Sequence, residues 1–250
     1  SFSAHIFCLF ICLYFIIIDF VLIFCRLMKN PIKIFLFLIY FFSSNNAFCF
    51  NYKSIHEFEI FQNNKKIGFH KLFFQNIEDR IVVNTEIQTT IKLIGIIPIF
   101  KYSHKGKEIW INNNFDEAKT STEKNRRKFK LIAKRKGSKI EIKSRKKVFL
   151  INGDSLFTSY WNQNWLKKKV LFDIQHGKKR FISVEKKDFE AIKTSNGTIF
   201  AQKYKVKGKQ NKPDGKKIDY EIWYDNKGRW VKTKFFIKNS LVEYFLVTKY

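Results

Sequence analysis

Cysteine is scarce in this sequence, and its distribution excludes a fold stabilised by disulfides. The 250 residues contain four cysteines. Cys8, Cys12 and Cys25 all precede residue 28, and Cys49 is the only cysteine after it. Because a disulfide needs two thiols, the chain beyond Cys49 must be held together by a hydrophobic core. About two hundred residues are enough for one domain with such a core.

Methionine is rarer still, since Met28 is the only one. The residues after it have the three zones of a secretory signal peptide: a cationic start, an apolar run over residues 34–42, and a polar tail that ends at Ala47. The apolar run is too short to span a bilayer, which takes about 20 apolar residues. We therefore expect a signal peptide over residues 28–47.

Residues 1–27 precede this methionine, and we interpret them as an upstream extension that is not part of the native protein. The alternative is an inner-membrane anchor on residues 6–25, with Arg26 at its cytoplasmic end. Asp19 opposes insertion, because an acidic residue near the centre of a spanning helix costs about 2.5–3.5 kcal/mol. Without the anchor, the mature chain over residues 48–250 is expected to be periplasmic or secreted.

Acidic residues are also few. Lysine and arginine number 48 against 21 aspartates and glutamates, so the net charge is +27. Such a charge would attract nucleic acid, anionic lipid or acidic polysaccharide. The basic residues are spread over nearly every segment, with the densest runs at 124–128, 134–136 and 145–147. Since Lys, Asn, Ile and Phe all have A/T-rich codons, base composition explains the same charge, which favours solvated faces over a dedicated polyanion site.

Almost everywhere after residue 50, apolar residues alternate with polar ones, which is the period of a strand with one buried face. Short turn signals separate the alternating runs, namely 63–66, Gly137-Ser138, His176-Gly177, Asn196-Gly197 and 225–228. Consecutive hairpins without long crossovers predict a mainly β fold in a single domain. We expect a strongly curved antiparallel meander, a half-barrel of roughly ten strands.

One segment departs from this pattern. Phe157, Trp161 and Trp165 recur at every fourth position, which is helical spacing, and Asp154 or Ser155 can cap a helix there. The pattern predicts a short helix that covers an open end or the concave side of the sheet.

Catalytic signatures are absent from the sequence: it has no Gly-x-Ser-x-Gly, no phosphate-binding glycine loop and no Cys/His cluster with metal spacing. His104 and Glu108 are the best exception, because on a helix they would share a face and could bind a metal or exchange a proton. Gly106 and the flanking alternation favour a hairpin instead, with the pair in an ordinary contact. We therefore expect no cofactor, no metal ion and no specific nucleic acid, and we favour a function other than catalysis.

The sequence is rich in tryptophan and tyrosine residues that suit the lining of a ligand cavity and suit an ordinary core equally well. They are Trp110, Trp161, Trp165, Trp223, Trp230, Tyr102, Tyr160 and Tyr224.

Four short motifs resemble a family of small secreted alphaproteobacterial proteins known only as a domain of unknown function. They are Tyr-x-His-x-x-x-Glu-x-Trp at 102–110, Thr-x-x-Asn at 122–125, Trp161-Asn162, and Trp-Tyr-Asp with Gly-Arg-Trp-Val over 223–231. The resemblance covers most of residues 55–247. That family is in turn similar to the periplasmic lipoprotein-carrier (lipoprotein localisation factor) superfamily, in which a helical lid closes a curved antiparallel sheet over an apolar cavity. The high lysine content departs from the family.

The resemblance and the aromatic pattern together suggest a protein that binds or carries an apolar lipid or acyl ligand on the concave face. The candidate ligand-binding residues are Tyr102, His104, Glu108, Trp110, Tyr160, Trp161, Asn162, Trp223 and Tyr224. The alternative is an envelope-associated structural protein whose basic surface binds anionic lipid or glycan. Salt distinguishes the two, since contacts to anionic groups weaken as ionic strength rises.

Overall fold

The computed structural model describes residues 50–93, 97–145, 147–211, 215–237 and 239–250. The predicted upstream extension, signal peptide and alternative anchor lie outside the described residues. All described residues belong to one compact unit, Phe50–Tyr250. In this part of the chain, no helix has the length and apolar character needed to cross a membrane.

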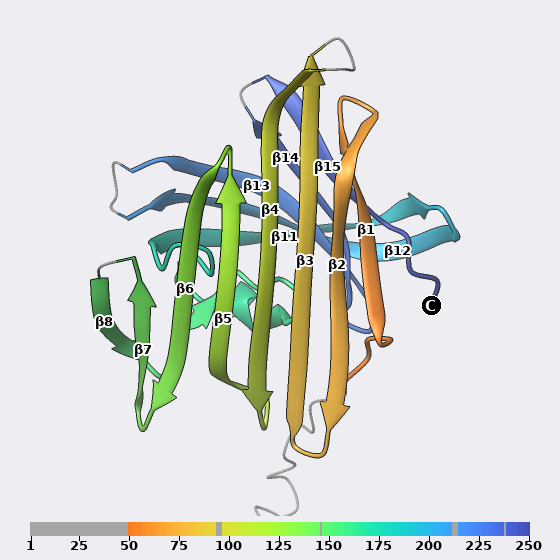
Figure 1. Ribbon diagram of the computed structural model, residues 1–250. Coiled ribbons are helices and arrows are strands. Elements are labelled where there is room, and N and C mark those ends of the chain that lie inside the picture. Colours follow the sequence, from red (N-terminus) through yellow and green to blue (C-terminus); the bar gives the residue numbers. More distant parts are fainter. Residues whose placement is uncertain (1–49, 94–96, 146, 212–214, 238) are drawn as a thin grey trace, which may run out of the picture. The chain divides into compact units, whose positions relative to one another are not determined.

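Fifteen strands form a single sheet, in the order β8-β7-β6-β5-β4-β3-β2-β1-β15-β14-β13-β12-β11-β10-β9 (Figure 1). The strands are β1 (Ile55–Gln62), β2 (Lys65–Ile77), β3 (Arg80–Leu93), β4 (Ile97–Ile111), β5 (Asn114–Lys124), β6 (Arg127–Lys136), β7 (Lys139–Ser144), β8 (Lys147–Asn152), β9 (Leu156–Phe157), β10 (Val170–Phe172), β11 (Lys179–Thr194), β12 (Gly197–Gln210), β13 (Lys217–Asp225), β14 (Trp230–Ile237) and β15 (Ser240–Leu246).

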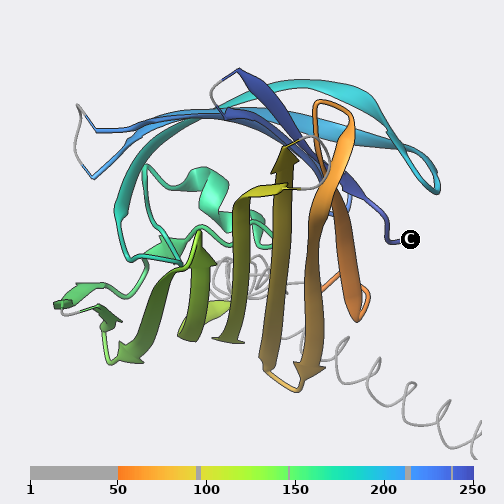
Figure 2. The same cartoon turned by 45° about the horizontal axis from the view of Figure 1, so that its top comes forward.

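The sheet is a meander that bends back over itself. Each strand from β1 to β8 pairs antiparallel with the next, and so does each strand from β10 to β15. The first strand also pairs with the last, with Phe58 opposite Leu246. Strands β1–β8, the first layer, therefore face strands β10–β15, the second layer (Figure 2). This confirms the predicted mainly β, strongly curved antiparallel sheet.

The predicted hairpin turns agree with the structure, but one expected hairpin does not exist. Turns connect β1 to β2, β6 to β7, β11 to β12 and β13 to β14 at the expected positions, and Gly137 has the positive φ (59°) that its turn requires. The hairpin expected at Gly106 is wrong, because β4 runs unbroken through this residue, which lies opposite Thr85 and Thr120. The strand count exceeds the expected ten partly because β9 has only two residues, too few to show alternation.

The helix expected over residues 154–166 is replaced by the two-residue strand β9, turns and a short 3-10 helix, η1 (Gln163–Lys167). Pairing with β10 holds the first part of this segment extended, with Leu156 beside Leu171 and the Thr158 amide donating to the Phe172 carbonyl at 2.9 Å. The Asn162 side chain caps η1 by accepting from the Asn164 amide at 3.0 Å.

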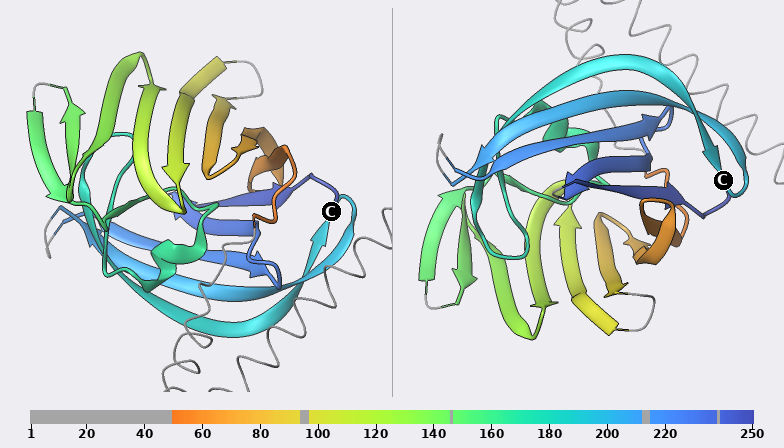
Figure 3. Two further views of the ribbon diagram at one scale, coloured as in Figure 1. Left: turned by 90° about the horizontal axis from the view of Figure 1, so that it is seen from below. Right: turned by 90° about the horizontal axis from the view of Figure 1, so that it is seen from above.

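Residues 153–178, which we call the inner segment, lie between the two layers of the sheet (Figure 3). The face of the sheet toward this segment is the inner face, and the opposite face is the outer face. Trp161, Trp165 and Phe157 of the inner segment are at most 2 % exposed. Trp161 packs on Trp110 with ring centroids 5.2 Å apart, and Phe157 packs on Phe115 at 4.5 Å. The chain itself therefore fills much of the concave side of the sheet.

Candidate functional site

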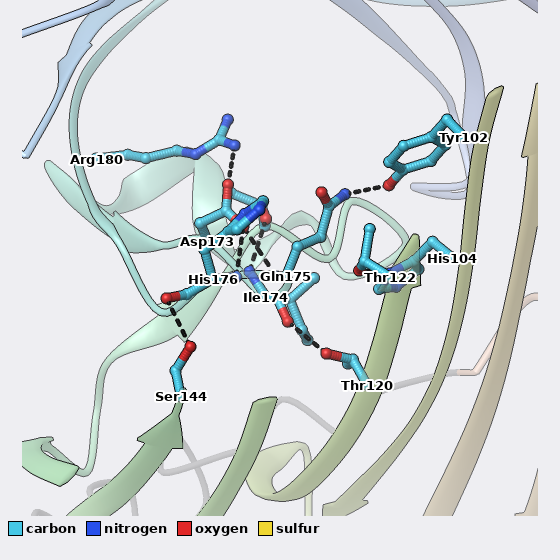
Figure 4. Close-up of polar contacts among 11 residues, drawn as sticks. Tyr102, His104, Thr120, Thr122, Ser144, Asp173, Ile174, Gln175, His176 and Arg180 are labelled. Carbon is cyan, nitrogen blue, oxygen red and sulfur yellow. Dashed lines mark hydrogen bonds and ion pairs between the residues drawn. The ribbon is translucent and has the colours of Figure 1, made fainter. Parts of the chain in front are cut away.

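Polar side chains fasten the inner segment to both layers of the sheet. Four hydroxyl groups donate hydrogen bonds to its backbone carbonyls: Thr120 to Ile174 (2.9 Å), Ser144 to His176 (3.0 Å), Tyr52 to Trp161 (2.8 Å) and Tyr224 to Tyr160 (2.6 Å). The first two come from the first layer (Figure 4), and Tyr224 comes from the second. Each such bond to a buried carbonyl avoids a loss of about 1–3 kcal/mol, so the segment is held as part of the core.

Asp173 organises the turn that leads into β11 (Figure 4). Its carboxylate is buried, accepts hydrogen bonds from the backbone amides of Gln175 (2.8 Å) and His176 (3.1 Å), and forms an ion pair with Arg180. Burial alone would raise the pKa of Asp173, but the hydrogen bonds and charges of His176 and Arg180 outweigh it and hold that pKa well below its usual range. The charge is therefore retained for structure at neutral pH.

Tyr102 and His104 lie on the inner face of β4, beside this turn. The Gln175 side-chain amide donates to the Tyr102 hydroxyl at 2.5 Å, and His104 Nδ1 lies 2.8 Å from Thr122 Oγ1 (Figure 4). Burial lowers the pKa of His104 to about 4, so its ring is neutral at pH 7.

Glu108 lies further along the same strand with partners of its own. It accepts hydrogen bonds from Trp110 Nε1 at 3.0 Å and from Ser159 Oγ at 2.7 Å. Burial raises the pKa of Glu108 to about 6, against the opposing effect of these two donors. Four residues along a strand separate His104 from Glu108 by about 13 Å. The structure therefore does not bring this predicted pair together, either on a helix face or across a turn.

The remaining predicted site residues divide between the two faces of the sheet. Tyr160, Trp161 and Asn162 belong to the inner segment, and Trp110 and Tyr224 contact it. Trp223 points the other way, because neighbouring residues in a strand face opposite sides. On the outer face, its Nε1 donates to Glu190 at 2.9 Å. A single inner site could therefore use the other predicted residues but not Trp223.

Sequence reasoning missed His70 on β2, which is 7% exposed and whose two ring nitrogens have no hydrogen-bond partner among the described residues. Its ring lies among aromatic side chains, 5.2 Å from Trp230 and 5.9 Å from Tyr244 between centroids. Burial, followed by the nearby His104 and His56, lowers the pKa of His70 to about 3. The sequence contained one sign of this buried residue: in the alternating pattern of β2, His70 occupies a position whose side chain faces inward.

Two hydroxyl groups on the inner face contact titratable side chains. Ser159 donates to Glu108, which also accepts from Trp110, whereas among the described residues the Thr122–His104 pair lacks the third, orienting group that an activated nucleophile needs. The described part of the chain likewise has no group of three or more side chains that could hold a metal ion.

A groove of about 420 Å³ crosses the outer face of β4, β5 and β6. It is lined by Lys105, Gly106, Lys107, Lys119, Thr120, Ser121, Lys130, Leu131 and Ile132, and we call it the basic groove. The register places Lys107 directly opposite Lys119. Ser121 lies opposite Lys105 on one side and Lys130 on the other.

The basic groove carries a positive charge that few acidic groups offset. Lys119 forms an ion pair with Glu117 at 2.8 Å, and Lys105 reaches Glu86 only at 3.8 Å. Within the described residues, no ion pair involves Lys107 or Lys130. Exposed ammonium groups around a largely apolar floor suit anionic groups.

A second groove, of about 650 Å³, lies at the β1–β2 turn and the facing part of β3. It contains two lysines, Lys65 and Lys66, and Lys66 is paired with Glu59. Its positive charge is therefore smaller than that of the basic groove.

The comparisons with known proteins establish a family but no activity. A family model described as a domain of unknown function, DUF6134, matches residues 58–247, and the chain belongs to this family. No curated protein matches the chain. The family match confirms the predicted resemblance to a domain of unknown function. The predicted alphaproteobacterial origin and the likeness to lipoprotein carriers stay predictions.

The solved structures that are similar to the chain include the following three. The β-barrel-like protein of a domain of unknown function, DUF1849, from Brucella abortus has a TM-score of 0.53 at 12% identity, and the match covers 79% of this chain and 98% of that one. A candidate exported protein with a YmcC-like fold from Bacteroides fragilis has a TM-score of 0.37 at 11% identity, covering 78% and 95%. A candidate lipoprotein from Parabacteroides distasonis has a TM-score of 0.37 at 12% identity, covering 77% and 92%. The first likeness shows a shared fold alone.

Proposed function

We propose that this member of the DUF6134 family binds anionic surfaces, either lipid headgroups or acidic glycans, through the basic groove. The observation that carries the proposal is the direct opposition of Lys107 and Lys119 on β4 and β5. Like charges directly opposite each other on a sheet weaken the pairing of their strands. A sheet selected for stability alone would have an acidic or neutral residue at one of these positions.

The lysines of the basic groove are suited to a surface that carries many negative charges. Each basic side chain held near an anionic membrane surface contributes about 1 kcal/mol, and this contribution decreases as salt screens it. Lys105, Lys107, Lys119 and Lys130 together would therefore contribute about 4 kcal/mol at low salt. The groove offers attraction and orientation but no reactive group, which fits an envelope-associated structural role.

The same proposal places the chain outside the cytoplasm. The signal pattern over residues 28–47 supports export, and the periplasm or cell exterior contains anionic lipid and glycan surfaces within reach of the groove.

The test uses residues 50–250, which form a compact unit with its own core. Binding is measured by co-sedimentation with vesicles that contain phosphatidylglycerol and by retention on immobilised heparin, each at low and high salt. Replacing Lys107 and Lys130 with Gln should weaken both about 30-fold at low salt. The matched control, Lys187→Gln with Lys217→Gln, removes the same charge from the second layer and should have little effect. Equal losses in both variants, or no binding by the unsubstituted chain, would contradict the proposal.

An apolar ligand on the inner face is the second candidate function. The observation that favours it is a small hydrophobic cluster apart from the main core, in which Ile60, Ile87 and Val242 pack against half-buried aromatic residues, among them Tyr102 and Tyr244. A ligand would lie beside this cluster, because the inner segment occupies the main core. Bound lipid in mass spectra, or uptake of a fluorescent fatty acid that persists at high salt, would support this function. The absence of both would remove it.

A further inference from the structure

Three aliphatic side chains protrude from the outer face beside the basic groove. Ile132 on β6 is 43% exposed, and Val148 and Leu150 on β8 are 61% and 55% exposed. Ile132 lies opposite Lys119 on one side and Lys143 on the other, and Lys143 lies opposite Val148. Strands are about 4.8 Å apart, so Ile132 and Val148 are about 10 Å apart on one continuous surface.

Among the described strands, β8 is an edge of the sheet that pairs only with β7, which makes its exposed apolar side chains unusual. Edge strands normally carry charged or otherwise protective residues, because an apolar edge invites aggregation. Here Val148 and Leu150 point outward and Phe149 between them is half-buried. The exposed apolar side chains on β8 therefore indicate that a binding partner covers them.

We propose that this face docks on an anionic phospholipid bilayer. The lysines of the basic groove would contact headgroup phosphates, while Ile132, Val148 and Leu150 enter the boundary between headgroups and acyl chains. On surfaces that combine basic residues with protruding apolar residues, the burial of apolar groups and the attraction to anionic lipids both contribute to membrane binding. The inference rests on the proposed function and commits it to lipid rather than glycan.

The chemistry of the protruding residues distinguishes a bilayer from other polyanions. Aliphatic side chains gain little from a hydrated glycan, and single-stranded nucleic acid is bound mainly by aromatic stacking together with charge. A bilayer interface removes aliphatic groups from water and presents negative charge within the same few ångströms. A bilayer therefore suits both the lysines of the basic groove and the three protruding aliphatic side chains.

The second layer provides an internal control. Phe200 on β12 is 70% exposed, more than any of the three aliphatic residues, but it lies opposite Ala191 rather than a lysine. An exposed apolar side chain that is not adjacent to the lysines of the basic groove should not dock on a bilayer.

The first experiment replaces Ile132, Val148 and Leu150 together with Thr, which is polar but retains the β-branched shape that strands favour. Co-sedimentation of residues 50–250 with vesicles of phosphatidylglycerol and phosphatidylcholine should weaken by about tenfold or more, since the burial of three aliphatic groups is lost. Retention on heparin should not change, because no charge is altered. The Phe200→Thr control should leave both unchanged.

The second experiment measures insertion directly. Residues 50–250 contain no cysteine, so Val148→Cys provides a single thiol for an environment-sensitive fluorophore. On adding the same anionic vesicles, its emission should shift to the blue and become protected from an aqueous quencher. The same fluorophore on Phe200→Cys should show neither change.

The outcomes separate this inference from the proposed function. In one outcome, the double Gln variant at Lys107 and Lys130 binds vesicles and heparin more weakly, while the triple Thr variant binds vesicles normally and the fluorophore at position 148 does not respond. This outcome overturns bilayer docking but leaves anion binding intact. If the unsubstituted chain binds neither vesicles nor heparin, both are overturned. Selective loss of vesicle binding in the triple variant, with a blue shift at Val148, supports both.

Discussion

Two lysine sites, one on the outer face of each layer, have opposite electrostatic settings. On the second layer, Lys205 lies opposite Glu221, and Lys232 reaches Glu243 at 3.0 Å. On the first layer, Lys107 lies opposite Lys119. The register of neighbouring strands, not lysine content, therefore decides whether a lysine supports the fold or is free to bind a partner.

The lysines around these two sites also differ in burial. Lys203 and Lys232 have only 21% and 17% of their side chains exposed, because their stems cover the ring of Trp223. Lys105 and Lys119 of the basic groove have 75% and 65% exposed. A half-buried lysine over an indole is part of the packing, while an exposed one can reach a ligand.

The largest effect is expected from Trp223→Ala in the second layer. The indole is 2% exposed and is covered by two lysines, so its loss should destabilise the fold by about 3–5 kcal/mol in urea denaturation. Binding to anionic vesicles by the remaining folded protein should stay the same. Phe200→Ala, at an exposed position, is the control and should change stability by less than about 0.5 kcal/mol. A comparable loss of binding would show that the two layers are not independent.

The next largest effect is expected from Glu108→Gln. This variant tests whether vesicle binding depends on the charges of the outer face or on the net charge of the whole protein. Since burial raises the pKa of Glu108 from 4.5 to about 6, the folded state holds the proton more tightly than the unfolded state. The unsubstituted chain should therefore lose up to about 2 kcal/mol of stability as pH rises from 4.5 through 6. The Gln variant should be more stable above this range and equal below it. The Gln variant loses a negative charge on the inner face, so tighter binding at pH 7 would contradict the division between faces.

A smaller effect is expected when the second layer is made to resemble the first. Glu221→Lys places two lysines directly opposite each other at positions 205 and 221, and it should destabilise the fold by about 1 kcal/mol at low salt. Added salt should reduce the loss because it screens the repulsion. Asp188→Lys, at an exposed position in the β11 bulge where the register gives no residue directly opposite, is the control in parallel thermal denaturation. An unchanged melting temperature in the Glu221 variant would remove cross-strand pairing as the explanation.

The smallest change in stability is expected from the reverse exchange, Lys107→Glu. An acidic residue opposite Lys119 should stabilise the fold by about 0.5 kcal/mol while weakening vesicle binding. Opposite signs for stability and binding would show that the lysine pair is retained for function. A fall in both would mean that Lys107 supports the fold.

Local patterns were reliable where the deciding contacts are also local. Asn196-Gly197 and Gly137-Ser138 predicted their hairpins, because turn geometry depends on the turn residues themselves. The helix predicted around Trp161 was wrong, since that residue's aromatic neighbours come from strands far away in the chain, such as Trp110. His70 was missed because its aromatic surroundings come from Trp230 and Tyr244, which lie far along the chain.

Alternation along the chain by itself determined that this protein forms antiparallel strands with one buried and one solvated face, because side chains alternate between the faces of any strand. Only the tertiary structure decided which residues meet across strands. A bulge between Ile109 and Trp110 shifts the β4–β5 pairing by one residue, so Lys107 faces Lys119 instead of Ala118. Because a one-residue shift moves every side chain to another partner, the basic groove depends on this register and on the inner segment that closes the opposite face.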